Sequence, residues 1–364
     1  MMHAFLARCA RPVRPDAPDA GLVDAAAAVS DWARALDLAE QHGIAPLIHE
    51  HTRAAGVVLP ADARSQLQAL HVRHRRANEV KLRVLAEILD AFAADGIEAR
   101  VLKGPALMVL VYGAPALRPT SDLDILVRDA DAHRAQRALR RLGFTAPAEA
   151  AGPAIRHHLP PATRSVERTL IQVEIHRDAL SMDGRASIVL AEGRESPLTF
   201  DLHGRTASTL GVHETLWQIS EHLVGSLPRP LRLVWIADVV GVAETFADRI
   251  DWARVARDYP VVLQVLAFAH ALTPLRADVV AHVPAHTRRA QAHGMAAALA
   301  WSPAGGVRGQ GRWPHLRRTM APPAWWLDLR YGGAGGPSRW MRRLHHLAVV
   351  SRASRRRAEA ARRR

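Results

Sequence analysis

Residues 118–127 read RPTSDLDILV, and this stretch decides how the rest of the chain is interpreted. Aliphatic residues alternate with Asp122 and Asp124 and continue to Val127, a pattern that predicts a β-strand. Because successive side chains on a strand point to opposite faces, the two aspartates share one face. Carboxylates so close together repel each other unless a cation neutralises them. The pair is therefore either two solvated acids at a strand end or a site for Mg²⁺, which prefers carboxylate oxygens.

A lysine and a glycine precede this strand in residues 98–105, EARVLKGP, which predict a short strand that runs into a turn. Pro105 suits the first position of a helix, which we expect to continue to Tyr112. A helix start offers free N–H groups to anions, so the turn at Gly104 is a candidate phosphate cradle. Lys103 is one of only two lysines in a chain that otherwise uses arginine. Unless its placement is chance, it indicates a need for a compact positive charge.

A third acid lies on a second predicted strand, residues 170–176, LIQVEIH. Its aliphatic residues form one face, which leaves Gln172, Glu174 and His176 on the other. Glu174 is therefore a candidate third carboxylate beside the aspartate pair. The alternative is a half-exposed strand with a polar outer face.

Together these motifs resemble the uncharacterised nucleotidyltransferases of the polymerase-β-like superfamily, over roughly residues 40 to 285. One departure concerns the phosphates: the superfamily's usual glycine–serine pair lies nearer the aspartates, whereas here Lys103-Gly104 takes its place and 17 residues separate Gly104 from Asp122. The resemblance rests on Lys103-Gly104, Tyr112, Arg118, Ser121–Val127, Val173–His176, His213, His222, Arg232–Asp238 and Ile250–Trp252.

The resemblance implies an enzyme that moves a nucleoside monophosphate from an NTP onto a hydroxyl of a small molecule, peptide or protein and releases pyrophosphate. Catalysis and metal binding, with Mg²⁺ or Mn²⁺, then fall to Asp122, Asp124 and Glu174. The expected nucleotide contacts are Lys103, Gly104, Arg118 and Ser121. The acceptor, the preferred base and the oligomeric state stay open.

Three other functions compete with this interpretation. The first is an RNA-directed nucleotidyltransferase anchored by a basic tail, so nucleic acid is a possible but not favoured partner. The second is a catalytically inactive nucleotide-binding or regulatory module. The third is a phosphotransferase or kinase that uses the same metals.

Composition sets broad bounds. The 364 residues suffice for two domains with ample core, and 49% are hydrophobic. No apolar run approaches the length of a membrane span, and the arginines before residue 15 argue against a signal peptide. Cys9 is the single cysteine, which excludes internal disulfides, and the histidine spacing does not signal a zinc site. A cytoplasmic location is the resulting expectation.

The predicted fold class is α+β, a small mixed β-sheet core flanked by helices. We expect an N-terminal helical region over 1–95, the nucleotidyltransferase core over 96–203, a C-terminal helical domain over 204–300, and a Gly/Pro-rich linker with an Arg-rich tail over 301–364. Helices are expected at about 206–224, 230–246, 251–274 with a break at Pro260, and 284–300. From residue 339 the tail carries ten arginines against one acid, nine of the fourteen net positive charges. Such a tail is expected to be solvated and disordered.

Three polar residues of the helical half have either a structural or a functional role. Asp238 lies on an otherwise apolar helical stretch, where an unpaired carboxylate is costly to bury. His213 and His222 belong to the resemblance but are typical of packing residues as well.

Overall fold

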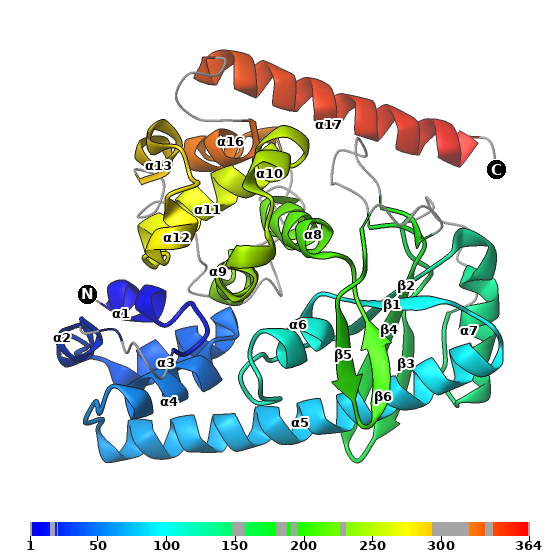
Figure 1. Cartoon of the computed structure of the whole chain (residues 1–364), viewed down its shortest axis with the longest axis horizontal. Helices are drawn as coiled ribbons and strands as arrows, with labels where there is room; N and C mark the ends of the chain where they lie inside the picture. Colours follow the sequence, from blue (N-terminus) through cyan, green and yellow to red (C-terminus); the bar gives the residue numbers. More distant parts are fainter. Residues whose placement is uncertain are drawn as a thin grey trace. The chain divides into compact units, whose positions relative to one another are not determined.

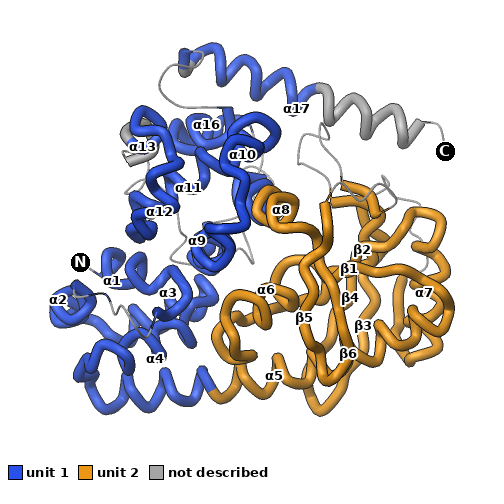
Figure 2. Tube along the Cα trace, viewed as in Figure 1, with its two compact units in different colours: residues 1–71, 219–354 blue, residues 72–218, 355–364 orange. Residues whose placement is uncertain are grey.

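The computed structural model describes residues 2–14, 19, 21–147, 157–179, 188–190, 195–225, 231–292, 320–331 and 338–362, without the side chains of 289–292, 339 and 352–362. Figure 1 labels its helices and strands. The chain forms two compact units, one of residues 1–71 and 219–354 and the other of residues 72–218 and 355–364 (Figure 2).

The second unit contains a four-stranded mixed sheet with the order β1-β2-β4-β3. The central strands β2 and β4 run parallel, while β1 pairs with β2 and β3 pairs with β4 in antiparallel fashion. The prediction of a small mixed sheet in an α+β fold is confirmed. The strands are β1 (Ala99–Leu102), β2 (Leu123–Val127), β3 (Ala162–Val166) and β4 (Thr169–His176).

One face of this sheet carries the hydrophobic core. Along β4 the buried residues alternate with half-buried ones, as the sequence predicted, so that Val173 and Ile175 point into the core and Glu174 does not. The core is completed by the long helix α5 (Ala61–Ala94), by α6 (Gly104–Leu110) and by α7 (Ala132–Arg141), which follows the short 3₁₀ helix η1 (Asp129–Asp131). The opposite face of β2 and β4, which does not pack on this core, is therefore available to polar side chains.

A hairpin that the sequence analysis missed also belongs to this unit. Strands β5 (Thr199–Leu202) and β6 (Arg205–Ser208) pair across a turn at His203 and Gly204, which both have positive φ angles. Two such residues favour a tight hairpin turn. The predicted helix at 206–224 is therefore wrong at its start, because β6 occupies 205–208 and helix α8 (Val212–Gly225) begins only afterwards.

The first unit is helical. Gly43 ends α3 in the left-handed conformation, with φ 71°, and the predicted break at Pro260 separates α10 from α11. No helix among the described residues has the length and apolar character that a membrane crossing requires. The helices are α1 (Met2–Arg8), α2 (Leu22–Ala27), α3 (Trp32–His42), α4 (Ala45–Ala54), α9 (Leu233–Thr245), η3 (Ala247–Arg249), α10 (Trp252–Asp258), α11 (Pro260–Leu272), α12 (Ala277–Val280), α13 (Ala285–Ala292), α16 (Ala324–Tyr331) and α17 (Arg339–Arg362).

Two expectations for the C-terminal part are corrected. Helix α16 lies inside the stretch that composition marked as linker, and its two tryptophans are buried. Helix α17 replaces the expected disordered tail up to Arg362. Its start is fixed because Arg342 pairs with Asp328 and the His346 ring contacts the hydroxyl of Tyr331 at 3.0 Å. The remaining linker at 293–319 and 332–337 and the last two arginines lie outside the described residues.

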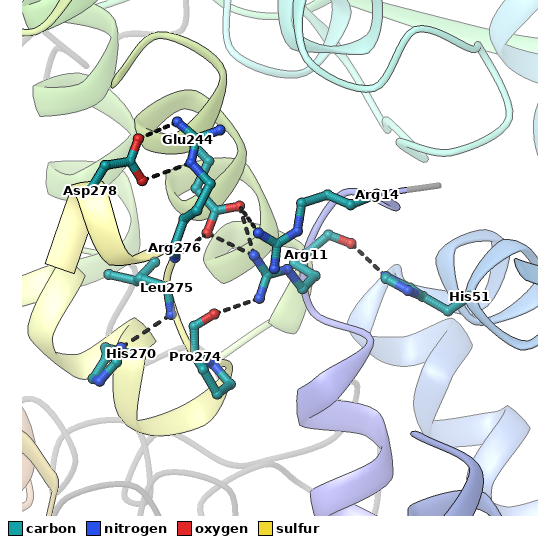
Figure 3. Close-up of polar contacts among 9 residues, drawn as sticks. All are labelled: Arg11, Arg14, His51, Glu244, His270, Pro274, Leu275, Arg276 and Asp278. Atoms are coloured by element: carbon teal, nitrogen blue, oxygen red, sulfur yellow. Dashed lines mark hydrogen bonds and ion pairs between the residues drawn. The ribbon is translucent and has the colours of Figure 1, made fainter. Parts of the chain in front are cut away.

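A buried ion-pair network links distant segments of the helical unit (Figure 3). The Arg11 guanidinium donates to both carboxylate oxygens of Glu244 at 2.7 Å, and the backbone N–H of Arg276 donates to the same carboxylate at 2.9 Å. Arg14 lies 3.8 Å from it. His51 contacts the Arg11 carbonyl at 2.9 Å. Glu244 on α9 is therefore tied both to the N-terminal segment and to the residues before α12.

Candidate active site

Two of the three acids that the sequence singled out, Asp124 and Glu174, meet on the polar face of the two central strands. In the parallel register of β2 and β4, Asp124 lies opposite Glu174 and Leu126 lies opposite His176. Ligand atoms of Asp124, Glu174 and His176 all lie within 4.8 Å of one another. Two neighbouring strands, 50 residues apart in the chain, thus place two carboxylates and an imidazole at one point.

Asp124 is the buried centre of this cluster, with only 4% of its surface exposed. One of its oxygens lies 2.8 Å from the Lys103 ammonium, and the other lies 2.9 Å from Nε2 of His176. Burial opposes the charged carboxylate, but these two partners outweigh it and hold the pKa of Asp124 well below its usual range. In the same way, burial opposes the Lys103 ammonium, yet the carboxylates raise the pKa of Lys103. Both groups are therefore charged at neutral pH.

The backbone of Lys103 adopts a conformation that is favourable for glycine and strained for any residue with a Cβ atom. Its φ and ψ angles are 53° and −127°, at the cap of helix α6 directly before Gly104. Such a conformation costs about 1–3 kcal/mol and persists only where the surroundings impose it. Strand β1 on one side and helix α6 on the other hold the residue, so that its ammonium reaches Asp124.

Asp122 stands at the edge of the cluster and is half-buried. Burial and the negative charge of Asp124 raise the pKa of Asp122, and Glu174 adds to this effect. Lys103 and a hydrogen bond from Ser121 oppose the rise without cancelling it. The negative charge gathered around Asp122 is therefore incompletely neutralised by the chain's own groups.

Polar neighbours orient the side chain of Glu174. The Gln172 amide donates to one carboxylate oxygen at 3.1 Å. The imidazoles of His158 and His176 lie 3.8 Å from the other oxygen, with their ring centres 5.3 Å apart. His176 shares the polar face predicted for Glu174, whereas His158, which joins β4 through an isolated bridge, was not predicted.

Helix α5 holds the loop that leads into β2. Asn78 donates to the carbonyls of Pro115 and Arg118 at 2.6 and 3.0 Å, and Lys81, one turn further on, donates to the carbonyl of Thr120. Burial lowers the pKa of Lys81, although the charge of Asp122 acts against this. Both lysines of the chain therefore lie at this site. Their rarity is the sequence signal that could have identified Lys81.

The predicted nucleotide contacts Gly104 and Arg118 pack against each other. A Cβ atom at Gly104 would lie 2.7 Å from the Thr120 hydroxyl and 3.2 Å from the Arg118 guanidinium, so only glycine permits this close approach. Arg118 is buried and donates to the carbonyl of Pro119 at 2.7 Å. Ser121 is exposed beside Asp122.

The donor set fits a hard divalent cation. Asp124 and Glu174 face each other on β2 and β4, Asp122 directly precedes β2, and carboxylate oxygens of this type suit Mg²⁺ or Mn²⁺. Asp124 already has Lys103 and His176 as partners.

The chain belongs to a family described as uncharacterised nucleotidyltransferases, whose pattern matches residues 28–272. The matched region contains all the site residues described above. The protein is therefore a nucleotidyltransferase of this family. A comparison with curated proteins finds no match.

Some solved structures are similar to part of the chain. ANT(2″)-Ia in complex with adenylyl-2″-tobramycin has 13% identity and a TM-score of 0.36, over 49% of this chain and 96% of that one. The solution structure of the same antibiotic-resistance factor gives the same two values over 50% and 92%. An antigenic nucleotidyltransferase-like protein from Paracoccidioides brasiliensis has 16% identity and a TM-score of 0.33, over 55% and 96%. The family assignment rests on the match over residues 28–272.

Proposed function

We propose that this enzyme transfers a nucleoside monophosphate from an NTP to a hydroxyl of a small molecule, peptide or protein and releases pyrophosphate, with Mg²⁺ or Mn²⁺ as the metal. The observation that carries the proposal is the register of β2 and β4, in which Asp124 lies opposite Glu174, with Asp122 directly before the first residue of β2. Family membership supplies the reaction class, and this cluster supplies the residues.

Asp122, Asp124 and Glu174 are the groups to hold the metal. Bound divalent cations supply neutralisation of phosphate charge and alignment of the attacking and leaving oxygens. Glu174 also has the chemistry to accept the proton of the acceptor hydroxyl. Lys103 keeps Asp124 ionised through its 2.8 Å contact.

Further residues serve the nucleotide in this proposal. Lys103 and Arg118 neutralise the charge that builds on the departing phosphates, as cationic groups do in phosphoryl transfer. Gly104 brings α6 close to the loop at Arg118, and Ser121 contacts the nucleotide from the exposed start of β2. Asn78 and Lys81 position this loop through backbone carbonyls.

The test is incubation of the protein with each labelled NTP, Mg²⁺ and a metabolite extract, followed by mass spectrometry of the products. We expect one nucleotide to become attached to an acceptor and pyrophosphate to appear. Release of nucleoside diphosphate would instead indicate a kinase, and extension of added RNA an RNA-directed enzyme.

Matched variants connect the activity to the site. Asp122→Ala should abolish turnover, whereas Asp129→Ala should not change it, because Asp129 is an exposed carboxylate just beyond the same strand. If Asp122→Ala retained a near-normal rate, the proposed chemistry would be refuted.

A further inference from the structure

The helical unit contains a cluster of metal-ligating side chains of its own. Helix α4 supplies His49 and Glu50, and helix α5 supplies His71. One ligand atom of each residue lies within 4.8 Å of the other two, and the two imidazole ring centres are 4.8 Å apart. The three side chains are 16–18% exposed, so they are largely desolvated yet still accessible to an ion.

The Glu50 carboxylate is held in one orientation. Its oxygen Oε2 accepts hydrogen bonds from Nε and Nη2 of Arg53 at 2.9 and 2.7 Å. Its oxygen Oε1 lies 3.9 Å from Nε2 of His49 and 3.9 Å from Nδ1 of His71. These two distances are too long for hydrogen bonds. One oxygen is thus fixed by a guanidinium, while the other faces two imidazole nitrogens at equal distance.

This arrangement has nearly the size of a zinc site. Zinc bonds of about 2.0–2.1 Å in tetrahedral geometry place neighbouring ligand atoms about 3.3 Å apart. The 3.9 Å separations need only a small side-chain adjustment to reach this value. Two imidazoles and one carboxylate select zinc or a similar transition metal over Mg²⁺ and Ca²⁺, which prefer oxygen ligands alone.

We propose that His49, Glu50 and His71 bind Zn²⁺, with water in the fourth position and Arg53 as the group that orients the carboxylate. The bound ion joins α4 to α5, two helices that follow each other in the chain with residues 55–60 between them. Because such a site exists only in the folded protein, zinc stabilises the fold. His71 lies 21 positions after Glu50 and on another helix, so no short sequence motif marks the site.

The test is a competition titration of Zn²⁺ against a chromophoric chelator, using the full chain without a histidine tag. An Asp124→Asn background reduces binding at the acid cluster. His71→Ala should weaken the zinc affinity at least 100-fold. His74→Ala is the matched control, since His74 is the next histidine of α5 and contacts Arg73; it should stay within twofold of the parent. Equal affinities for the parent and His71→Ala would overturn the proposal.

Cobalt gives a second readout that does not depend on activity. Co²⁺ in a tetrahedral site of nitrogen and oxygen ligands produces visible absorption, which should appear with the parent and with His74→Ala and be absent with His71→Ala. Glu50→Gln should weaken zinc binding as well, and it serves as the test variant if His71→Ala does not fold. Zinc should raise the melting temperature of the parent and of His74→Ala but not that of His71→Ala. An unchanged melting temperature in the parent would contradict the proposal.

Discussion

The two units of the molecule each bury a carboxylate, and the surroundings of the two groups differ. Glu244, 8% exposed, accepts hydrogen bonds from Nη2 of Arg11 to both of its oxygens and from the backbone N–H of Arg276. Asp124, 4% exposed, contacts Lys103 and His176 but also has Asp122 and Glu174 beside it. Glu244 thus has only hydrogen-bonding partners of opposite or neutral character in this comparison. Asp124 has two such partners and, in addition, two like charges near it.

Burial of an acid alone is therefore a poor indicator of function. The charges of the neighbouring side chains are a better one. A buried ion pair with satisfied hydrogen bonds is a structural element, and removing one partner is costly because the other is left buried and charged. A cluster of like charges at a strand end is unfavourable by itself, and binding of a divalent cation with phosphates would explain it. Substitutions at the two carboxylates and their partners test this difference between a structural and a functional buried acid.

Asp124→Asn should reduce kcat at least 1000-fold, because the carboxylate that joins Lys103, His176 and the metal is lost. The variant also leaves Lys103 less well paired, so part of the stability is lost too. The double variant Asp124→Asn/Lys103→Met should recover stability in urea unfolding without recovering turnover. If the double variant regained activity, Asp124 would be no more than a structural partner of Lys103.

Glu244→Gln should lower the free energy of unfolding by about 3 kcal/mol, because the buried Arg11 guanidinium loses its charged partner. Turnover per folded molecule should stay unchanged. Urea unfolding and steady-state kinetics on the same preparation separate the two quantities. A large loss of kcat in the folded variant would remove the distinction between the two buried acids.

Lys103→Arg should lower kcat about 100-fold, a loss of about 2.7 kcal/mol in transition-state stabilisation. A planar guanidinium cannot replace a compact ammonium at the 2.8 Å contact with Asp124, and the strained backbone leaves little room to adjust. The reverse exchange Arg100→Lys, on the strand β1 that directly precedes Lys103, is the control and should change kcat less than twofold. Equal effects of the two exchanges would show that the identity of the cation is unimportant.

The helical unit should lose stability at acidic pH through His42. Burial and the positive charge of Arg232 lower the pKa of His42 to about 4, and its Nδ1 accepts the N–H of Leu233 at 3.4 Å. Since the unfolded pKa is about 6.5, the contribution is complete above pH 6.5 and is lost as the pH falls towards 4. Between pH 7.5 and 5 the wild type should lose about 2 kcal/mol more than His42→Gln in urea unfolding. Parallel losses in the two proteins would show that His42 does not titrate in this way.

Alternation and glycine positions were sufficient for most elements, because they reflect local physics. The aliphatic pattern of residues 123–127 and 171–175 predicted β2 and β4 together with their polar faces. Pro260 marked a helix break for a steric reason that holds in any fold. The roles of the three acids, by contrast, stay predictions for the experiments above.

What the sequence did not disclose depends on tertiary pairing. Alternation identifies the faces of a strand but not its neighbour, so the place of His176 beside Asp124 follows only from the parallel register. Lys81 reaches the site through a carbonyl, a partner that every residue possesses. The start of helix α17 is held by the ion pair of Arg342 with Asp328, and no local sequence pattern predicts that these two residues pair.

The parallel pairing of β2 with β4 also bears on how the enzyme is made. Parallel strands cannot be joined by a tight turn, so the chain must leave β2, form α7 and β3, and return before Glu174 reaches Asp124. A growing chain that ends before residue 174 has both aspartates but only half of the cluster. Such distant contacts form slowly, since a long loop must first close. Any metal ion that bridges the two strands would then bind only to molecules in which β2 and β4 have paired, and it would stabilise that pairing.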